Sequence, residues 1–214
     1  MVDSLLKEMA QVLKDDVSQR IVAAALVLFA EGGYMGTAMG DVAARAEVSA
    51  GNIYRYFATK AALFEAAVPM VFARRLRGLV KTRVEALHGE PSVTTLSIDH
   101  RWRAAAEELV RESVAQRLRV VVLLSDRKTE GTELAGYSQR MVDELVLLAL
   151  AWAKSVGVRR VLDARAKRTL TRIYRDFLAT MASILETHDN ERAIREAVSD
   201  YQAYHLAGMR GFLQ

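Results

Sequence analysis

Cysteine is absent from this chain of 214 residues, and proline occurs only twice. The lack of cysteine excludes disulfide bonds, thiolate catalysis and metal sites built from thiolates. The scarcity of proline, the absence of any Gly/Ser-rich run and an apolar content of 51% indicate a globular chain rather than a disordered one. A chain of this length can bury one large core or two smaller ones.

Long hydrophobic runs are also missing. The longest apolar stretches are residues 21–30 and 145–153, and both are too short to span a bilayer as a helix. The N-terminus lacks the succession of basic, apolar and small residues that marks a signal peptide. We therefore expect a cytoplasmic protein.

The sequence lacks the usual motifs of catalysis and metal binding. It contains no HExxH, GxSxG, phosphate-loop or dinucleotide-binding pattern. Adjacent acidic residues at 107–108 and 143–144 point about 100° apart on a helix, so neither pair forms a two-carboxylate site. No metal-ligand spacing links the four histidines, His88, His100, His188 and His205. These absences predict a protein that is not an enzyme and has no metal or cofactor.

Helical periodicity of apolar residues runs through the chain and predicts an all-α fold. Within residues 3–13 this spacing is carried by Leu5, Leu6, Met9, Val12 and Leu13. They predict an amphipathic N-terminal extension over residues 1–15, and an extension ordered only in places explains them equally well. Asp15 or Asp16 then caps a helix that ends at Gly32-Gly33.

The most informative stretch is residues 37–60, which reads as two short helices joined by a turn. Apolar residues from Met39 to Ala46 have helical spacing, and Thr37 is placed to cap that helix. Ser49 caps the second helix, whose Ile53 and Phe57 face inward. A helix of two turns rarely stabilises itself, so another element must support it. In a helix-turn-helix the first helix provides that support. A helical corner of any α protein, with Tyr54 and Tyr56 as half-buried aromatics, is the alternative.

The side chains of the second helix suit DNA recognition. Asn52 and Arg55 can pair with base edges, and the hydroxyl and ammonium groups around them can bind phosphates. The small residues Ala50 and Gly51 let the helix approach the groove closely. The predicted DNA-contacting residues are Thr37, Arg45, Ser49, Ala50, Gly51, Asn52, Tyr54, Arg55, Tyr56, Thr59 and Lys60.

Residues 20–64 resemble the N-terminal DNA-binding domain of TetR-family transcriptional regulators. The matching positions are Arg20, Ala24-Ala25, Leu28-Phe29-Ala30, Gly33-Tyr34, Thr37, Asp41-Val42-Ala43, Ala46, Val48-Ser49, Gly51, Ile53-Tyr54, Phe57, Lys60 and Leu63-Phe64. The resemblance implies an all-helical homodimer, usually a repressor, that a small molecule bound in the C-terminal domain releases from its operator. Residues 1–62 are then the helix-turn-helix domain, and residues 63–214 are the ligand-binding and dimerisation domain.

Two positions depart from the family pattern. Glu47 stands where the family usually has glycine in the turn, and a positive φ is strained for any residue other than glycine. Gly40 stands where the family often has a basic residue that contacts phosphate. The domain is also not basic, because residues 1–65 hold six Lys and Arg against eight Asp and Glu. We expect DNA affinity to depend more on helix N-termini and hydroxyl donors than on a broad basic field.

Pro69 interrupts the helix that begins at Lys60, so we expect a break near Val68. A bend there can relay a ligand-driven shift between the domains, and a plain helix boundary is the alternative. Beyond it, the sequence predicts a buried apolar face and a solvated basic face. The basic face is formed by Arg74, Arg75, Arg77, Lys81 and Arg83.

Two further long helical stretches are predicted at residues 99–125 and 132–155, the second buried on several sides. The last two helices carry wide apolar stripes that suit an intermolecular four-helix bundle, with an intramolecular hairpin as the alternative. The resemblance to the TetR family implies dimer contacts in the last two helices and therefore favours the bundle. The predicted dimer contacts are Tyr174, Phe177, Met181, Ile194, Ala197, Val198, Tyr201, Tyr204, Gly208 and Met209.

A pocket between the helices of the larger domain is expected to be mostly apolar. The candidate ligand-binding residues are Trp102, Tyr137, Met141, Trp152 and Phe177, although core packing explains each of them as well. This lining favours a hydrophobic or aromatic effector. The combined prediction is a dimeric regulator that binds double-stranded operator DNA and is released by such a ligand. A helical interaction or scaffold protein without DNA binding is the alternative.

Overall fold

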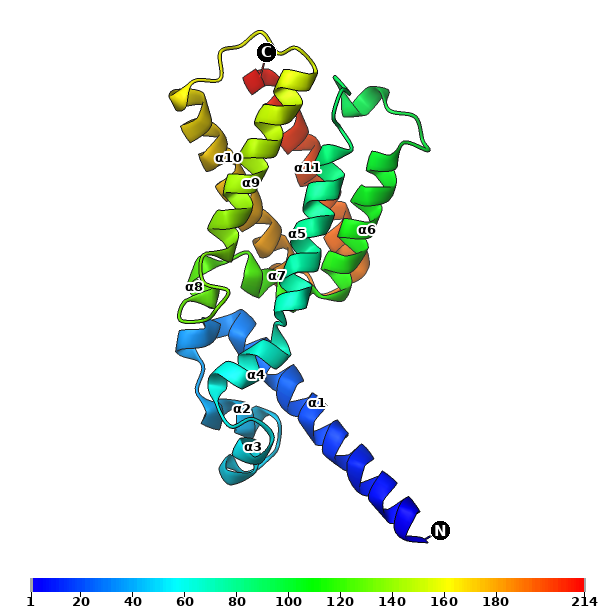
Figure 1. Ribbon diagram of the computed structural model, residues 1–214, viewed down its shortest axis with the longest axis vertical. Helices are drawn as coiled ribbons and strands as arrows, with labels where there is room; N and C mark the ends of the chain where they lie inside the picture. Colours follow the sequence, from blue (N-terminus) through cyan, green and yellow to red (C-terminus); the bar gives the residue numbers. More distant parts are fainter. Residues whose placement is uncertain (1, 214) are drawn as a thin grey trace.

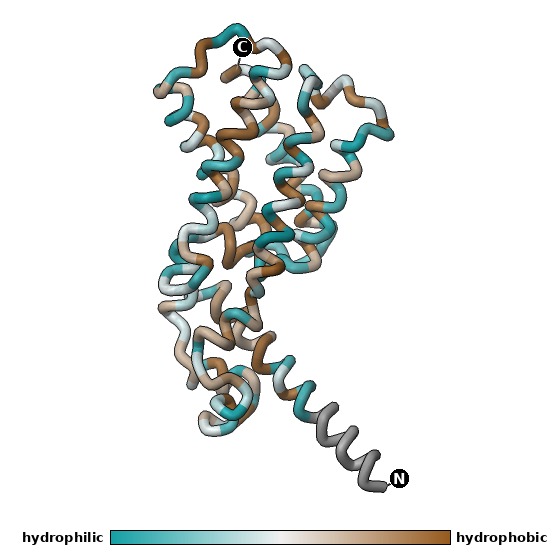
Figure 2. The backbone as a smooth tube through the Cα atoms, in the orientation of Figure 1, coloured by the Kyte–Doolittle hydropathy of each residue, from teal (hydrophilic) through white to brown (hydrophobic). Residues whose placement is uncertain are grey.

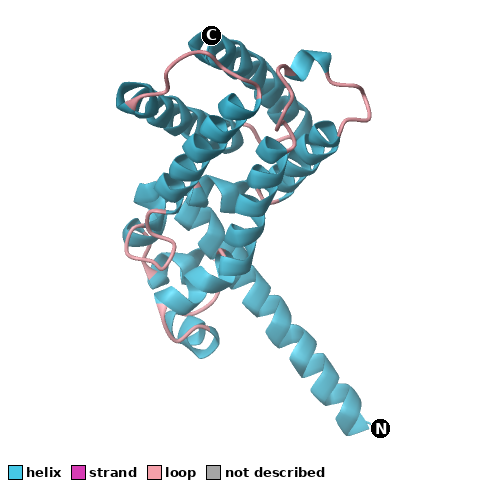
Figure 3. Ribbon diagram, turned by 45° about the horizontal axis from the view of Figure 1, so that its top comes forward, coloured by secondary structure: helices cyan, strands magenta, loops and turns pink. Residues whose placement is uncertain are grey.

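The computed structural model describes residues 2–213, and within them all regular structure is helical (Figures 1 and 3). The predicted all-α fold, with a helix-turn-helix domain followed by a larger helical region, is confirmed. The N-terminal group consists of α1 (Val2–Gly36), α2 (Met39–Arg45), α3 (Ala50–Tyr56) and α4 (Lys60–Ala67). The larger group consists of α5 (Met70–Glu85), α6 (Arg101–Ala115), α7 (Arg117–Leu123), α8 (Asp126–Thr129), α9 (Tyr137–Ser155), α10 (Ala164–Thr187) and α11 (Glu191–Leu213).

Helix α1 begins at Val2, so the predicted cap at Asp15 or Asp16 is wrong and the extension continues the first helix. The predicted apolar face of residues 3–13 concerns side chains outside the described set. Near its other end α1 kinks at Gly33, where φ is 74°. A Cβ atom at Gly33 would lie 3.0 Å from the Cα of Lys128. Glycine therefore lets the end of α1 pack directly on α8.

Helices α1 to α4 close around a small filled core. Ile53 of α3 and Phe29 of α1 are fully buried there, as the apolar spacing predicts for Ile53. The rings of Phe29 and Phe64 meet edge to face with their centroids 5.1 Å apart, so α4 packs on α1. The core holds α3 in place by one side only, because Ile53 is its one buried residue.

Pro69 separates α4 from α5 as predicted, and it is the N-cap of α5. The predicted helix over residues 99–125 is divided into α6 and α7 at Gln116, whose φ of −117° and ψ of 31° are not helical. Helix α9 packs on α5 and α10, but its remaining face is open and leaves Leu147 67% exposed. Apolar residues gather where the helices of the larger group face one another (Figure 2).

No single helix within residues 2–213 is both long and apolar enough to cross a membrane. One pair, Ala50–Tyr56 with Lys60–Glu85, meets the criteria jointly by length and composition, with a bend of 65° between its parts.

Candidate DNA-binding surface and ligand cavity

Helix α3 presents a polar face to solvent at its N-terminal end. The Ser49 side chain accepts a hydrogen bond from the Asn52 N–H at 3.2 Å, which confirms the predicted N-cap. Ile53 anchors the opposite face in the core. Nine of the predicted DNA-contacting residues are exposed or half-buried: Arg45, Ser49, Ala50, Gly51, Asn52, Tyr54, Arg55, Tyr56 and Thr59.

Thr37 and Lys60 are placed differently from the prediction. Thr37 is 5% exposed, its hydroxyl donates to the Gly33 carbonyl at 2.8 Å, and the N-cap of α2 is Ala38. The Lys60 ammonium donates to the carbonyls of Tyr34 at 2.8 Å and Thr37 at 3.0 Å. It also stands 4.3 Å from the centre of the Tyr34 ring. Both side chains therefore close the C-terminal end of α1, because carbonyls at a helix end need donors.

The turn between α2 and α3 is strained at the predicted position. Glu47 has a φ of 55° and is the only residue other than glycine with positive φ in the described chain. The backbone there takes the conformation that glycine adopts without cost. The turn therefore has the backbone conformation that glycine favours, and Glu47 adopts it at a cost in conformational energy.

The profile of the family described as "Bacterial regulatory proteins, tetR family" matches residues 21–67, which run from α1 through α4. The N-terminal domain belongs to the TetR family. This match identifies residues 21–67 as a DNA-binding domain of the kind found in TetR-family regulators of transcription. The curated proteins contain no match to it. Among solved structures, a chain from Mesorhizobium loti MAFF303099, described as a TetR-family transcriptional regulator, is similar with 20% identity and a TM-score of 0.45. That likeness covers 93% of this chain and 96% of the other.

The larger domain contains a cavity of about 680 Å³. Side chains from α5, α6, α7, α9, α10 and α11 line it, and most of them are apolar. The volume lies in the range of pockets that hold small organic molecules. Four of the five predicted ligand-binding residues are in the lining: Trp102, Met141, Trp152 and Phe177.

Tyr137 does not line the cavity. Its side chain is buried, and its hydroxyl donates to the Ala73 carbonyl at 2.8 Å. This bond joins α9 to α5, and burial raises the pKa of Tyr137 well above its usual value. Tyr137 therefore packs between two helices, and the prediction that it contacts the ligand is wrong.

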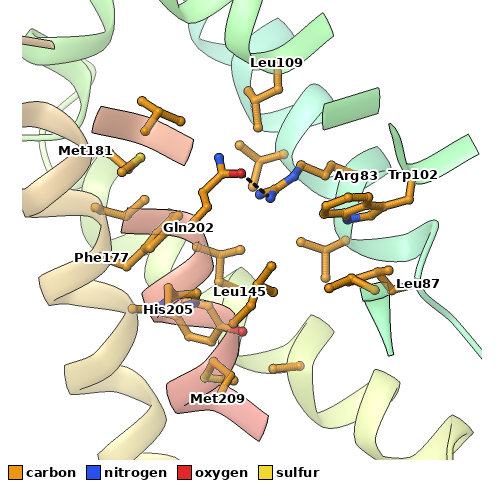
Figure 4. A pocket seen from close by; sticks show the side chains of 18 of the residues that line it. Arg83, Leu87, Trp102, Leu109, Leu145, Phe177, Met181, Gln202, His205 and Met209 are labelled. Carbon is orange, nitrogen blue, oxygen red and sulfur yellow. Dashed lines mark hydrogen bonds between the residues drawn. The ribbon is translucent and has the colours of Figure 1, made fainter. Parts of the chain in front are cut away.

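Arg83 lines the cavity, although the sequence analysis assigned it to the solvated face of α5. Its guanidinium extends across the cavity to Gln202 of α11 (Figure 4), where Nη2 donates to Oε1 at 3.2 Å. The guanidinium also stands 5.2 Å from the centre of the Trp102 ring. Helical spacing could have predicted that Arg83 faces inward. Arg83 follows Leu76 by seven residues and precedes Leu87 by four, so the three residues share the apolar face of the helix.

Most of the predicted dimer contacts face inward within one chain. Tyr174, Ile194 and Val198 are at most 8% exposed, so they are not available to a partner, and the prediction for them is wrong. Phe177, Met181 and Met209 line the cavity. Tyr204, which is 73% exposed, and Gly208 are the members of the set that lie fully on the surface of α11, with Ala197 and Tyr201 half-buried.

Helix α7 lies between the cavity and the DNA-binding domain. Its Val120, together with Leu124 just beyond its end, lines the cavity. From the same helix, Arg119 Nε donates to the Ala67 carbonyl at the end of α4 at 2.8 Å. Helix α7 also packs against α1 and α10. A displacement of the cavity wall therefore has a direct path to the helices that hold α3.

Proposed function

We propose that this protein is a dimeric repressor, released from its operator by a small and largely hydrophobic ligand bound in the cavity of the larger domain. The cavity carries the ligand part of the proposal, because a well-filled core leaves no void of this size. The exposed face of α3 supports the DNA-binding part. We also propose that the protein acts in the cytoplasm, where its operator DNA would lie, and we propose no catalytic role for any residue.

Helix α3 is the proposed recognition helix. Asn52 and Arg55 are the side chains there that can make bidentate bonds to base edges, and Arg55 is exposed. Arg45, Tyr54 and Thr59 supply donors to phosphate oxygens. We also propose that the two domains meet at Val68–Pro69 rather than at residue 62, because α4 packs on α1.

The proposed dimer contact is the outward face of α11. Exposed residues recur there at helical spacing, and most are small: Ala203, Tyr204, Ala207, Gly208 and Gly211. Small residues allow two helices to approach closely about a two-fold axis. Dimerisation would place two copies of α3 about 34–36 Å apart, in successive major grooves.

Release follows from differential binding to two conformations. A ligand that fits the cavity when α7 and α5 have shifted favours a domain orientation in which the two recognition helices no longer match one operator. Arg119 and the Pro69 joint are the proposed links, because each connects a helix that borders the cavity to α4.

Selection of binding sites from a random DNA pool, performed at two salt concentrations, tests the proposal. We expect an inverted repeat whose half-sites are spaced by about one helical turn, and affinity that falls as salt increases. Isolated half-sites would refute the dimer arrangement. Recovery of nothing above background would favour the alternative of a helical interaction protein without DNA binding.

A further inference from the structure

Arg83 is the one charged side chain that reaches from α5 across the cavity to the helix opposite (Figure 4). Leu76, Val80 and Leu87, which share its face of α5, are all apolar cavity-lining residues. Placing a guanidinium in such surroundings is costly unless a partner compensates its charge. A purely structural arginine in this position would therefore be expected to have a carboxylate beside it.

No carboxylate of the described residues pairs with Arg83. Its described hydrogen bond is the one to the neutral amide of Gln202, although a guanidinium has five N–H donors. Its Nε is shielded from solvent and has no hydrogen-bond partner among the described residues. Burial lowers the pKa of Arg83 to about 10, which still leaves it charged at neutral pH. The cavity thus contains a positive charge that no carboxylate of the described residues compensates.

The acidic residue of the lining is engaged elsewhere. Glu90 lies 3.6 Å from the Nε2 of His100, and its backbone carbonyl accepts from the indole N–H of Trp152 at 2.9 Å. The second arginine of the lining, Arg210, donates to Ser92 Oγ at 2.7 Å. Glu90 therefore forms no ion pair with Arg83.

Two further polar groups of the lining also lack hydrogen bonds to described residues. The Tyr174 hydroxyl and the His205 ring both belong to the cavity lining, and their rings lie 5.8 Å apart. Burial and the nearby Arg83 lower the pKa of His205 to about 4, so the ring is neutral at physiological pH and can donate one N–H. The mostly apolar lining of the cavity therefore holds a cation and two neutral hydrogen-bonding groups.

From this arrangement we infer that the effector is an organic acid, with one carboxylate that pairs with Arg83 and an apolar body that fills the rest of the cavity. The carboxylate would take the N–H groups of the guanidinium that Gln202 leaves unused. Tyr174 and His205 would donate to the same group. The inference rests on the proposed ligand function of the cavity and names the chemical class of that ligand.

The test compares ligands that share one hydrocarbon body and differ only in their head group. Dodecanoate, 1-dodecanol and dodecylamine form one set, and 4-phenylbutanoate with 4-phenyl-1-butanol forms a second. Binding to the full-length protein without DNA is measured by calorimetry and by the fluorescence of Trp102 and Trp152. We expect the acid of at least one set to bind about tenfold or more tightly than its alcohol, because hydrogen bonds to charged groups are the stronger ones.

Arg83→Met separates the charge from the packing, because methionine keeps an unbranched apolar stem. We expect this variant to bind acid and alcohol equally, while Arg83→Lys retains part of the preference. Arg74→Met is the matched control, because Arg74 lies exposed on the same helix and should keep the full preference.

Alcohols that bind as tightly as the acids would overturn the inference and leave the proposed apolar effector in place. An acid preference that survives in Arg83→Met would also overturn it. If no member of either set binds, the cavity is not a site for such molecules, and the inference falls while the operator selection still decides DNA binding.

Discussion

The two domains use their polar residues in opposite ways. In the DNA-binding domain the core is filled, and the polar side chains of α3 point outward next to one another on a single short helix. In the larger domain the centre is hollow, and Arg83, Tyr174 and His205 converge on it from three different helices. A surface built on one helix is local in sequence and can be recognised as a motif. A cavity is assembled from distant segments and leaves no comparable pattern.

The largest expected contrast is between a filled core and a cavity wall. Phe29→Ala should cost about 3–5 kcal/mol of stability, because Phe29 is fully enclosed. Phe177→Ala should cost only about 1–2 kcal/mol, because its ring already lacks neighbours on the cavity side. Urea denaturation of both variants measures the difference. Equal losses would mean that the cavity is filled by neighbouring side chains in solution.

The second contrast lies within the DNA-binding surface. Arg55→Ala should reduce discrimination between the best site and a single-base variant by up to about 3 kcal/mol, if Arg55 reads a base. Arg45→Ala, on the neighbouring helix, should instead weaken all sequences alike. Titrations on matched and mismatched sites measure both effects. A uniform loss in both variants would assign Arg55 to phosphate as well.

A third prediction uses the proton balance of the cavity. The pKa of His205 is lowered to about 4 in the folded state by burial and by Arg83, whereas an unfolded histidine titrates near 6.5. Between these values the unfolded chain binds more protons, so stability falls as pH decreases from about 6.5 toward 4. Relative to His205→Phe, the wild type should lose about 2 kcal/mol between pH 7 and pH 5. An equal change in the free energy of unfolding of the two proteins between pH 7 and pH 5 would contradict this prediction.

The smallest effect is expected in the turn between α2 and α3. Glu47→Gly should raise stability by about 1 kcal/mol or less, because glycine relieves the positive φ but gains entropy in the unfolded chain. Glu47→Ala, which removes the charge and keeps the strain, should give no such gain. Thermal melts of the pair separate the two causes. An equal gain in both would indicate that the carboxylate, not the backbone, is unfavourable.

Sequence reasoning succeeded where the interaction partner is close along the chain. The Ser49 cap and the break at Pro69 each depend on residues within four positions, and the inward placement of Ile53 follows from the spacing within its own short helix. Lys60 was predicted to contact DNA because an ammonium group suits phosphate, and the structure gives it other partners. These partners are the carbonyls of Tyr34 and Thr37, which lie 26 and 23 residues away. Thr37 was also predicted to contact DNA, and distance along the chain does not explain that difference, because its hydroxyl donates to Gly33 only four residues away.

The sequence by itself determined the helices, the helix-turn-helix and its likeness to one family, because capping, apolar spacing and proline breaks act over a few residues. Only the tertiary structure decided that the larger domain is hollow and that Arg83 faces this hollow. Helical spacing shows which residues share a face, but it cannot show whether the opposing helices meet there or leave a space. The packing of six helices decides whether a cavity forms there, and the shape and charge of that cavity decide which ligand can bind.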